Sequence, residues 1–340
     1  MRQATMAAPY KITFGDVPVP EIFDDEVLVK IRRIGICGSD IHVYHGKHPY
    51  TSYPVVQGHE VSGEIDKVGK AVEGLETGDV VTIVPQIVCG KCYACLHDQY
   101  HICDNLKVLG FQTMGVASDY FAVKADHVLK AGNIKNIDDV ALVEPVAVAV
   151  HALKRLGSME GKKVLILGAG PIGNLVGQTA KALGADKVMI TDVSDFRLEK
   201  AKACGIDFCV NSRLEDVGQA ITKYFGPDKA DCILDCAGVN STIDTAISNA
   251  RKGTDIVVVA VFADKASVDL GLVQDRELRL IGTLMYKKED FDTAIELIAD
   301  GKINTHLLIT NRFIFEDYLK AYEYIEEQKD QVMKVIVSLD

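Results

Sequence analysis

The segment that most constrains the fold is the glycine-rich turn GAGPIG, which begins at Gly168. It follows the apolar run VLIL and opens a helical pattern, the strand–turn–helix setting of a dinucleotide-binding fingerprint. Gly168 permits the tight turn, Gly170 lets the backbone approach a pyrophosphate, and Gly173 lets helix and strand pack closely. Pro171 and Ile172 open the helix that follows, and the N-terminal turn of this helix presents free backbone N–H groups to the phosphates. The sequence therefore predicts a nucleotide site here.

A carboxylate and an arginine follow this turn. The strand pattern VMITD ends at Asp192, roughly twenty residues after the fingerprint, and Arg197 lies in the next helical segment. A carboxylate at that place accepts hydrogen bonds from the ribose hydroxyls of NAD and repels the 2′-phosphate of NADP. Arg197 is placed to flank the adenosine. The plainer alternatives are a turn residue for Asp192 and a solvated helix charge for Arg197. We expect NAD as the cofactor.

The surrounding patterns predict the fold class. From about residue 146, short apolar runs (VLILGAG, VMITDV, CILDCAG, DIVVVAVF) alternate with helical segments. Uninterrupted apolar strands separated by helices indicate an α/β domain with a doubly wound parallel sheet. Residues 1 to about 145 differ, because glycines and prolines punctuate short Val/Ile runs there. That pattern predicts a β-rich barrel or sandwich.

Four cysteines lie within fifteen residues in the stretch CGKCYACLHDQYHIC: Cys89, Cys92, Cys95 and Cys103. Thiolates spaced this closely can converge on one tetrahedral metal ion, and coordination by sulfur alone favours zinc. An iron–sulfur cluster is the alternative, and it is disfavoured because the run does not end in Cys-Pro and lies in a nucleotide-binding chain. The sequence therefore predicts a structural zinc site.

A second candidate metal site has mixed ligands. Cys37 lies in GICGSDIH, His59 and Glu60 lie in GHEVSG, and Glu144 lies in VEPVAVAVH. A catalytic zinc needs about three protein ligands and one open position. Cys37 and His59 are the first two, and Glu60 or Glu144 supplies a carboxylate, directly or through water. Asp40 could orient His59 through the second ring nitrogen. Taken singly, each residue has an ordinary structural explanation.

Composition narrows the class of protein and its partners. The chain has 340 residues, of which 48% are hydrophobic and 25% are charged, with a net charge of −11. This length allows two domains with cores of their own, and the acidic balance argues against nucleic acid and anionic membranes as partners. No apolar run is long enough to span a membrane, and the first residues lack the apolar region of a secretory signal. We expect a cytoplasmic protein. The remaining cysteines are expected as buried small side chains: Cys204, Cys209, Cys232 and Cys236.

The motifs CGSDIH, GHEVSG, the four cysteines, EP followed by His, and GAGPIG with Asp192 occur in one order along the chain. In this order they resemble the zinc-containing medium-chain dehydrogenase/reductase family. The resemblance implies a GroES-like catalytic domain at residues 1–145 and 289–340. It implies a Rossmann NAD-binding domain at residues 146–288. It also implies a homodimer or homotetramer assembled through the nucleotide domain.

The resemblance assigns roles by position. It implies that the catalytic zinc ligands are Cys37, His59 and Glu60. Glu144 stands where alcohol dehydrogenases of the family have a cysteine, which resembles the polyol (sorbitol/L-iditol) dehydrogenase branch. Ser39 matches the hydroxyl that takes the substrate proton, and His42 matches the relay towards solvent. The plainer alternative for His42 is a hydrogen-bonded loop histidine.

The resemblance implies a zinc-dependent enzyme with two zinc ions per chain that transfers hydride from a secondary alcohol of a polyol to NAD. The chain departs from the polyol pattern at two places. Met285-Tyr286 stands where an Arg-Tyr pair is common, and Val43 stands where an aromatic residue often follows the histidine of CGSDIH. An unidentified polyol or sugar derivative is therefore expected instead of sorbitol itself. The alternatives are L-threonine 3-dehydrogenase and butanediol or sugar-acid dehydrogenases. A non-catalytic NADPH-sensing or structural relative is disfavoured by the intact Cys37, Ser39, His59 and Glu60.

Overall fold

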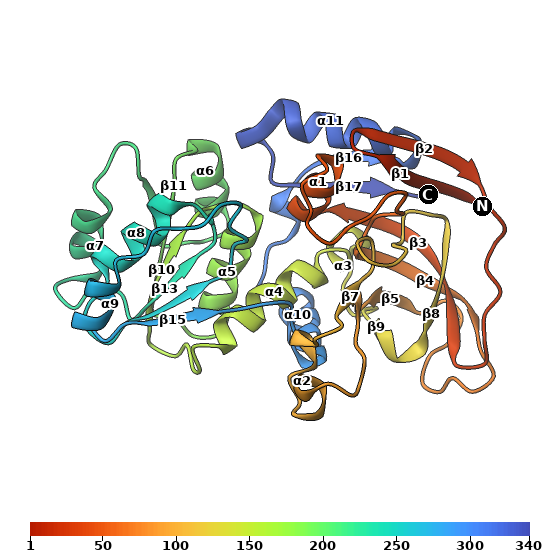
Figure 1. The fold of residues 1–340 in the computed structure, drawn as a ribbon, viewed down its shortest axis with the longest axis horizontal. Coiled ribbons are helices and arrows are strands. Elements are labelled where there is room, and N and C mark those ends of the chain that lie inside the picture. Colours follow the sequence, from red (N-terminus) through yellow and green to blue (C-terminus); the bar gives the residue numbers. More distant parts are fainter. The chain divides into compact units, whose positions relative to one another are not determined.

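The computed structural model describes all residues from Met1 to Asp340. The chain divides into two compact units (Figure 1). The first unit comprises Met1–Glu144, Lys287–Ala299 and Ile309–Asp340, and the second comprises Pro145–Tyr286 and Asp300–Leu308. The sequence predicts divisions at 145/146 and 288/289. The structure differs in giving the short segment 300–308 to the second unit.

The second unit is built on a six-stranded sheet with the order β12-β11-β10-β13-β14-β15. All neighbouring strands are parallel. The strands are β10 (Lys163–Leu167), β11 (Lys187–Asp192), β12 (Phe208–Asn211), β13 (Cys232–Asp235), β14 (Asp255–Val258) and β15 (Arg279–Gly282). The helices between them are α5 (Pro171–Ala182), α6 (Asp195–Ala203), α7 (Val217–Phe225), α8 (Asn240–Asn249) and α9 (Leu270–Asp275). The order reverses between β10 and β13, so the predicted doubly wound Rossmann fold is confirmed.

The apolar pattern explains this sheet. The residues of its central strand, Val164 to Leu167, are all buried, as expected of a parallel strand covered on both faces. The segment 300–308 joins this unit through a polar contact, since the backbone N–H of Asn304 donates to Oε1 of Gln178 at 2.6 Å. Gln178 lies on α5 and is itself buried. A single polar contact of this kind produces no periodic pattern in the sequence. The sequence therefore could not assign residues 300–308 to this unit.

The first unit is β-rich and GroES-like. Its seven-stranded sheet has the order β16-β17-β3-β4-β5-β9, with β8 paired to β3. The hairpin β1–β2 and the short pair β6–β7 form two further sheets. The strands are β1 (Arg2–Ala8), β2 (Lys11–Asp16), β3 (Glu26–Ile36), β4 (Glu60–Val68), β5 (Val80–Ile83), β6 (Gln86–Ile87), β7 (Lys107–Val108), β8 (Tyr120–Lys124), β9 (Val128–Lys130), β16 (Ile309–Ile314) and β17 (Lys334–Ser338).

Helices are short in the first part of this unit and longer towards the C-terminus. They are α1 (Gly38–Tyr44), α2 (Tyr93–Leu96), α3 (Ile137–Val140), α4 (Val143–Lys154), α10 (Lys288–Ala299) and α11 (Tyr318–Gln328). The division between the units falls inside α4. Figure 1 shows α11 running beside β16 and β17, with which it is in contact. No helix of the protein is both long enough and apolar enough to cross a membrane.

The C-terminal strand brings distant segments together. β17 pairs in parallel with β16 and antiparallel with β3, so that Val335 lies opposite Ile36. β3 pairs on its other side with β4, where Gly35 lies opposite Glu60. Residues near positions 36, 60 and 334 therefore meet at one end of three adjacent strands. The candidate catalytic metal site lies at this end.

Candidate metal and nucleotide sites

Three predicted ligands converge in the first unit. One donor atom from each of Cys37, His59 and Glu60 lies within 4.8 Å of the other two. Cys37 follows β3 and precedes α1, whereas Glu60 is the first residue of β4 and His59 directly precedes it. Gly35 makes room for the carboxylate, because a Cβ atom at that position would overlap Oε2 of Glu60. Cys37 is partly buried and the other two are buried, and a group of sulfur, nitrogen and oxygen donors is a suitable set for zinc.

Asp40 supports this group from α1. It is only 1% exposed, and its Oδ2 accepts a hydrogen bond from the backbone N–H of Cys37 at 2.9 Å. Its Oδ1 lies 3.6 Å from Nδ1 of His59, which is an electrostatic contact and longer than a hydrogen bond. Burial alone would lower the pKa of His59, but Asp40 and Cys37 more than offset this and raise it. The surroundings of His59 therefore favour a positive charge, which a metal cation would supply.

Lys334 is a site residue that the sequence analysis missed. Its Nζ donates to Oε1 of Glu60, and it also lies 3.5 Å from the carbonyl oxygen of Ile36. The lysine is 3% exposed. Burial lowers its pKa, but Glu60, Cys37 and Glu144 outweigh burial and raise it. The other carboxylate oxygen of Glu60, Oε2, has no hydrogen-bond partner. One carboxylate therefore presents one oxygen to a lysine and a second oxygen for a cation.

The other predicted catalytic residues lie nearby in the first unit. Ser39 is half-buried at the start of α1, with Oγ 3.8 Å from Sγ of Cys37. His42 is exposed in the last turn of α1. Glu144 is buried in the first turn of α4 and lies outside the group of three. It is close enough to Lys334 to raise the pKa of that lysine.

Two further buried residues touch Asp40 or its partner, and the sequence analysis did not identify them. Nε2 of Gln57 donates to Oδ1 of Asp40 at 3.2 Å. The hydroxyl of Tyr322, on α11, donates to Oε1 of Gln57 at 3.1 Å. Gln57 directly precedes the GHE segment, so its proximity could have been expected, but a contact with Tyr322 could not. These residues tie the metal site to the C-terminal helix.

The four cysteines form the second candidate metal site. One sulfur from each lies within 4.8 Å of the others, and none is in a disulfide. Backbone N–H groups of Cys89 and Asn105 each donate to Sγ of Cys103 at 3.3 Å. Backbone hydrogen bonds, that of Lys91 foremost, lower the pKa of Cys89 to about 6. Burial raises the pKa of Cys95 to about 12. Hydrogen bonds to sulfur stabilise thiolates, the form that binds metal.

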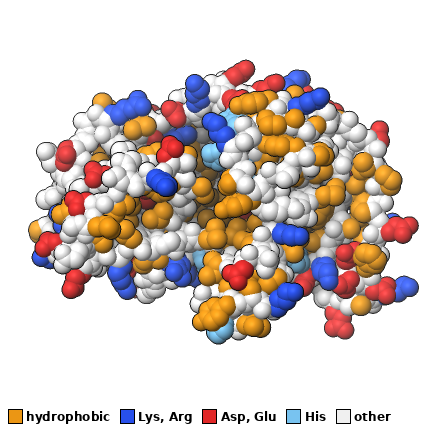
Figure 2. Space-filling model, in the orientation of Figure 1, with side chains coloured by type: hydrophobic (Ala, Val, Ile, Leu, Met, Phe, Trp, Pro, Cys, Tyr) orange, Lys and Arg blue, Asp and Glu red, His pale blue; other side chains and the backbone are white.

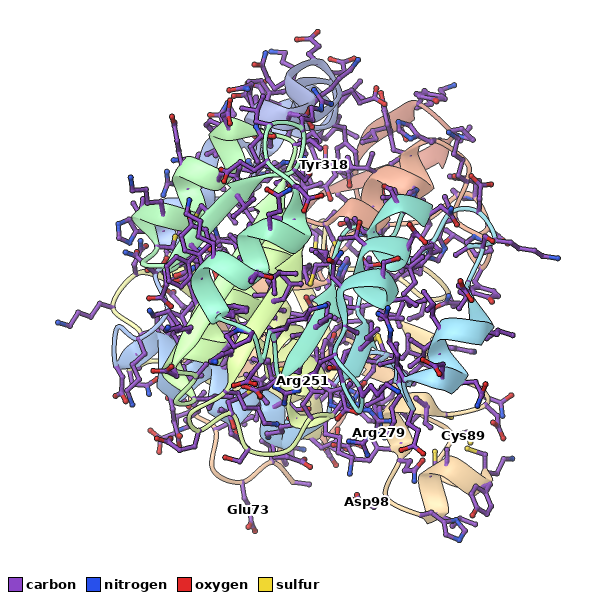
Figure 3. The ribbon with its side chains drawn as sticks, turned by 90° about the vertical axis from the view of Figure 1, so that its left-hand side faces the viewer. Glu73, Cys89, Asp98, Arg251, Arg279 and Tyr318 are labelled. Carbon is purple, nitrogen blue, oxygen red and sulfur yellow. The ribbon has the colours of Figure 1, made fainter.

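Residues 89–103 form a lobe that carries these cysteines. Polar contacts join this lobe to the residues at the start of α10. Lys287 pairs with Asp98 at 2.7 Å, and the backbone N–H of Lys288 donates to the hydroxyl of Tyr100 at 2.7 Å. Figure 3 shows Cys89 and Asp98 on this lobe, beside the helix α2. Figure 2 shows hydrophobic side chains on the surface of the same lobe, where Tyr93 is exposed. The lobe has little apolar core, which is the situation in which a structural metal stabilises a fold.

The glycine-rich turn has the geometry that its sequence predicts. Gly168 has φ +102°, a conformation that side chains disfavour. A Cβ at Gly173 would overlap the carbonyl oxygen of Gly168, so the helix can approach the strand only through glycine. Gly170 caps α5, and Pro171 follows at the first helical position. Beyond the adjoining backbone, no heavy atom lies within 4 Å of the place where a Cβ of Gly170 would be. The turn therefore leaves open space beside the free N–H groups of α5, starting at Ile172.

Asp192 ends β11 beside this turn. Its Oδ2 accepts from the backbone N–H of Ala169 at 2.7 Å. Its Oδ1 accepts from Val193 at 2.8 Å and from Ser194 at 2.9 Å. Nη1 of Arg197 lies 4.0 Å from Oδ2. Asp192 therefore has a structural role in holding the turn. A carboxylate offers about four acceptor positions, so it can still accept a further bond.

The residues of both units thus fit zinc and a nucleotide, and the fold and sites together define a zinc-dependent dehydrogenase. Residues 23–133 match the family "Alcohol dehydrogenase GroES-like domain", and residues 171–300 match the family "Zinc-binding dehydrogenase". The chain belongs to the zinc-containing medium-chain dehydrogenases, and its polyol-dehydrogenase-like character is confirmed. It is an oxidoreductase with zinc and a nicotinamide cofactor.

Individual relatives differ in substrate. The chain is 36% identical over 328 residues to L-threonine 3-dehydrogenase of Pyrococcus abyssi, which covers 94% of this chain and 93% of that protein. It is 30% identical over 342 residues to sorbitol dehydrogenase of Bacillus subtilis, covering 99% and 97%. The crystal structure of galactitol-1-phosphate dehydrogenase from Escherichia coli superposes with a TM-score of 0.93 at 31% identity, covering 100% of both chains.

Proposed function

We propose that the protein oxidises a secondary alcohol of a polyol or sugar derivative with NAD, using a catalytic zinc held by Cys37, His59 and a carboxylate. The observation that carries this proposal is the convergence of Cys37, His59 and Glu60 within 4.8 Å, beside the buried Lys334. When bound, zinc supplies a Lewis acid that lowers the pKa of the substrate hydroxyl, and the nicotinamide accepts the hydride. Glu144 is the second carboxylate available to the metal, directly or through water.

The protein's own residues bind the substrate and move its proton. Ser39 lies beside Cys37 on α1 and accepts the proton of the substrate hydroxyl. His42, on the same helix, is exposed and can pass that proton towards solvent. Asp40 holds the backbone at Cys37 and faces His59, so the ligands keep their places as the proton leaves.

An aromatic ring lies against the metal group, and the same ring lines a separate hollow that contains none of the proposed ligands. The ring of Phe111 packs against His59, with 5.0 Å between ring centroids, and against His48, with 4.7 Å. Phe111 also lines a hollow of about 630 Å³ whose other lining residues include Thr5 and Ser52. None of the lining residues is charged. Hydroxyls suit a polyol, and an aromatic wall suits its C–H groups.

L-Threonine is the second candidate substrate, because the relative from Pyrococcus abyssi is a threonine dehydrogenase with 36% identity. Its ammonium and carboxylate would require charged partners beside the metal. Lys334 is buried and paired with Glu60, and Asp40 is buried and accepts from Cys37 and Gln57, so neither is available to an amino acid. The polyol proposal therefore fits the residues better.

Asp192 supports NAD as the preferred cofactor. With its oxygens already holding three backbone N–H groups, the carboxylate is fixed at the end of β11. It would repel the 2′-phosphate of NADP and accept a hydrogen bond from the ribose hydroxyl of NAD. Gly168, Gly170 and Gly173, together with the start of α5, would receive the pyrophosphate.

The second unit also supports the expected homo-oligomer. β15 is the edge strand of its sheet, and Leu280 and Leu284 are exposed on or just after it. An exposed apolar edge strand is a template for pairing with another chain. A second copy at this edge would give the dimer, and replacing Leu280 with arginine should release monomers in sedimentation experiments. The cytoplasmic setting stays a prediction, consistent with nine free cysteines.

The substrate proposal is tested by initial rates of NAD reduction across sorbitol, L-iditol, xylitol, inositols, 2,3-butanediol, sugar acids and L-threonine. A polyol or sugar derivative should have the highest kcat/KM, and Cys37→Ser should abolish turnover of every substrate. A kcat/KM for L-threonine tenfold above every polyol and sugar derivative would end the polyol proposal.

A further inference from the structure

A row of buried polar side chains connects α11 to the candidate catalytic metal site. The hydroxyls of Tyr318 and Tyr322 lie 3.5 Å apart, and Tyr322 donates to Oε1 of Gln57 at 3.1 Å. Nε2 of Gln57 donates to Oδ1 of Asp40 at 3.2 Å, and that oxygen lies 3.6 Å from Nδ1 of His59. All five side chains are buried. The row spans 265 positions of sequence between Gln57 and Tyr322.

The direction of the hydrogen bonds in this row is determined by its members. Burial raises the pKa of both Tyr318 and Tyr322, so each hydroxyl keeps its proton. Tyr322 donates to the amide oxygen of Gln57, and this turns the amide NH₂ group towards Asp40. The carboxylate of Asp40 accepts, so the hydrogen bonds from Tyr322 through Gln57 both point towards the metal site.

Asp40 is consequently held at both oxygens. Oδ2 accepts from the backbone N–H of Cys37 at 2.9 Å, and Oδ1 accepts from Gln57 at 3.2 Å. The oxygen that receives the amide proton is the one that faces Nδ1 of His59. A carboxylate on one ring nitrogen sets the orientation of a metal-binding histidine and leaves the other nitrogen for the metal. Gln57 thus holds the oxygen of Asp40 that lies 3.6 Å from Nδ1 of His59.

We propose that Gln57 and Tyr322 are positioning residues for the catalytic metal, acting on His59 through Asp40. The inference rests on the proposed metal site at Cys37, His59 and Glu60. Through this row, the packing of α11 should influence the affinity of the site for its metal, although no residue of α11 belongs to the ligand group.

A purely structural role predicts something different. If Gln57 and Tyr322 only satisfy each other's buried polar groups, replacing one should destabilise the fold, and replacing both with apolar residues should restore it. Neither change should then alter the metal. If they position Asp40, the double replacement should restore stability and leave the metal site impaired. Stability and metal binding therefore separate the two roles.

The experiment uses the full-length protein and the variants Gln57→Leu, Tyr322→Phe and the double variant. The control is Thr82→Val, which removes a buried 2.8 Å hydrogen bond to the carbonyl oxygen of Val61 without touching the row. The catalytic site is depleted of zinc and titrated with Co²⁺, whose visible absorption reports coordination geometry, and thermal unfolding is measured in parallel. We expect Gln57→Leu and the double variant to bind Co²⁺ about tenfold more weakly, the lower end for outer partners of metal ligands. We expect Tyr322→Phe to fall between them and the wild type.

The control variant should bind Co²⁺ as the wild type does. Wild-type affinity and an unchanged Co²⁺ spectrum in Gln57→Leu and in the double variant would overturn the inference. A matching loss in Thr82→Val would also overturn it, because the effect would then be general destabilisation. If the wild type bound no Co²⁺ beyond the four-cysteine site, the proposed function itself would fail, which is a separate result.

Discussion

Replacing Lys334 with methionine should destabilise the first unit, and more strongly without metal than with it. Lys334 and Glu60 are both buried and paired, so removal of the lysine leaves a buried carboxylate without its cation. Breaking a buried pair in this way costs about 3–5 kcal/mol. For a unit of this size, 1 kcal/mol shifts Tm by about 2–4 °C, so the transition should fall by roughly 6–20 °C. Zinc would replace the missing positive charge, so the loss should shrink when the site is loaded.

Differential scanning calorimetry of zinc-loaded and metal-depleted protein measures this difference directly. The four-cysteine site is present in both wild type and variant. Its contribution therefore cancels when the Tm difference between zinc-loaded and metal-depleted protein is compared between the two. The matched control is the double variant Lys334→Met/Glu60→Gln, which replaces both charges with neutral groups and should recover most of the lost stability. A metal-free Lys334→Met protein that unfolds within about 1 °C of the wild type would refute the reasoning. So would a double variant no more stable than the single one.

Three further outcomes are expected. Cys92→Ser should lose the zinc of the four-cysteine site and unfold or disassemble more readily. Cys37→Ser should keep the wild-type circular dichroism spectrum and lose turnover. An active Cys37→Ser protein would contradict these roles. Asp192→Ser should erode the preference for NAD over NADP in kcat/KM, and a wild type that favours NADP would overturn the assignment. Burial raises the pKa of Asp231, but the backbone N–H of Lys163 and the guanidinium of Arg251 outweigh it and lower the pKa. The stabilisation from Asp231 is therefore present above its unfolded pKa of about 3.9 and is lost as pH falls through the lower folded value. The Tm gap between wild type and Asp231→Asn should narrow below about pH 4, and a gap independent of pH would show that ionisation of Asp231 is irrelevant.

Local patterns were sufficient to predict much of the fold and part of the candidate site. Short apolar runs between helical segments predicted the parallel sheet, because burial on both faces leaves a mark in each strand. The spacing of the cysteines from Cys89 to Cys103 predicted a group that the structure brings together. The same holds for Cys37, which directly follows β3, and His59, which directly precedes the neighbouring strand β4.

Contacts between distant segments could not be predicted in this way. Lys334 sits among the apolar residues of MKVIVSLD, and only the pairing of β17 with β3 brings it to Glu60. A lone lysine at the start of an apolar strand was the one available signal. Gln57 and Tyr322 meet across 265 positions with no shared period. The structural role of Asp192 could not be predicted either. Its hydrogen bonds to backbone N–H groups depend on the geometry of the turn and not on a pattern of side chains.

Anomalous diffraction at the zinc absorption edge, from crystals of an active preparation, tests the central claim most directly. The account predicts two zinc positions per chain. One should be bound by Cys89, Cys92, Cys95 and Cys103. The other should be bound by Cys37 and His59 with a carboxylate from Glu60 or Glu144, directly or through water. A fully active preparation with zinc only among the four cysteines would contradict the claim that a metal at Cys37 and His59 carries the reaction.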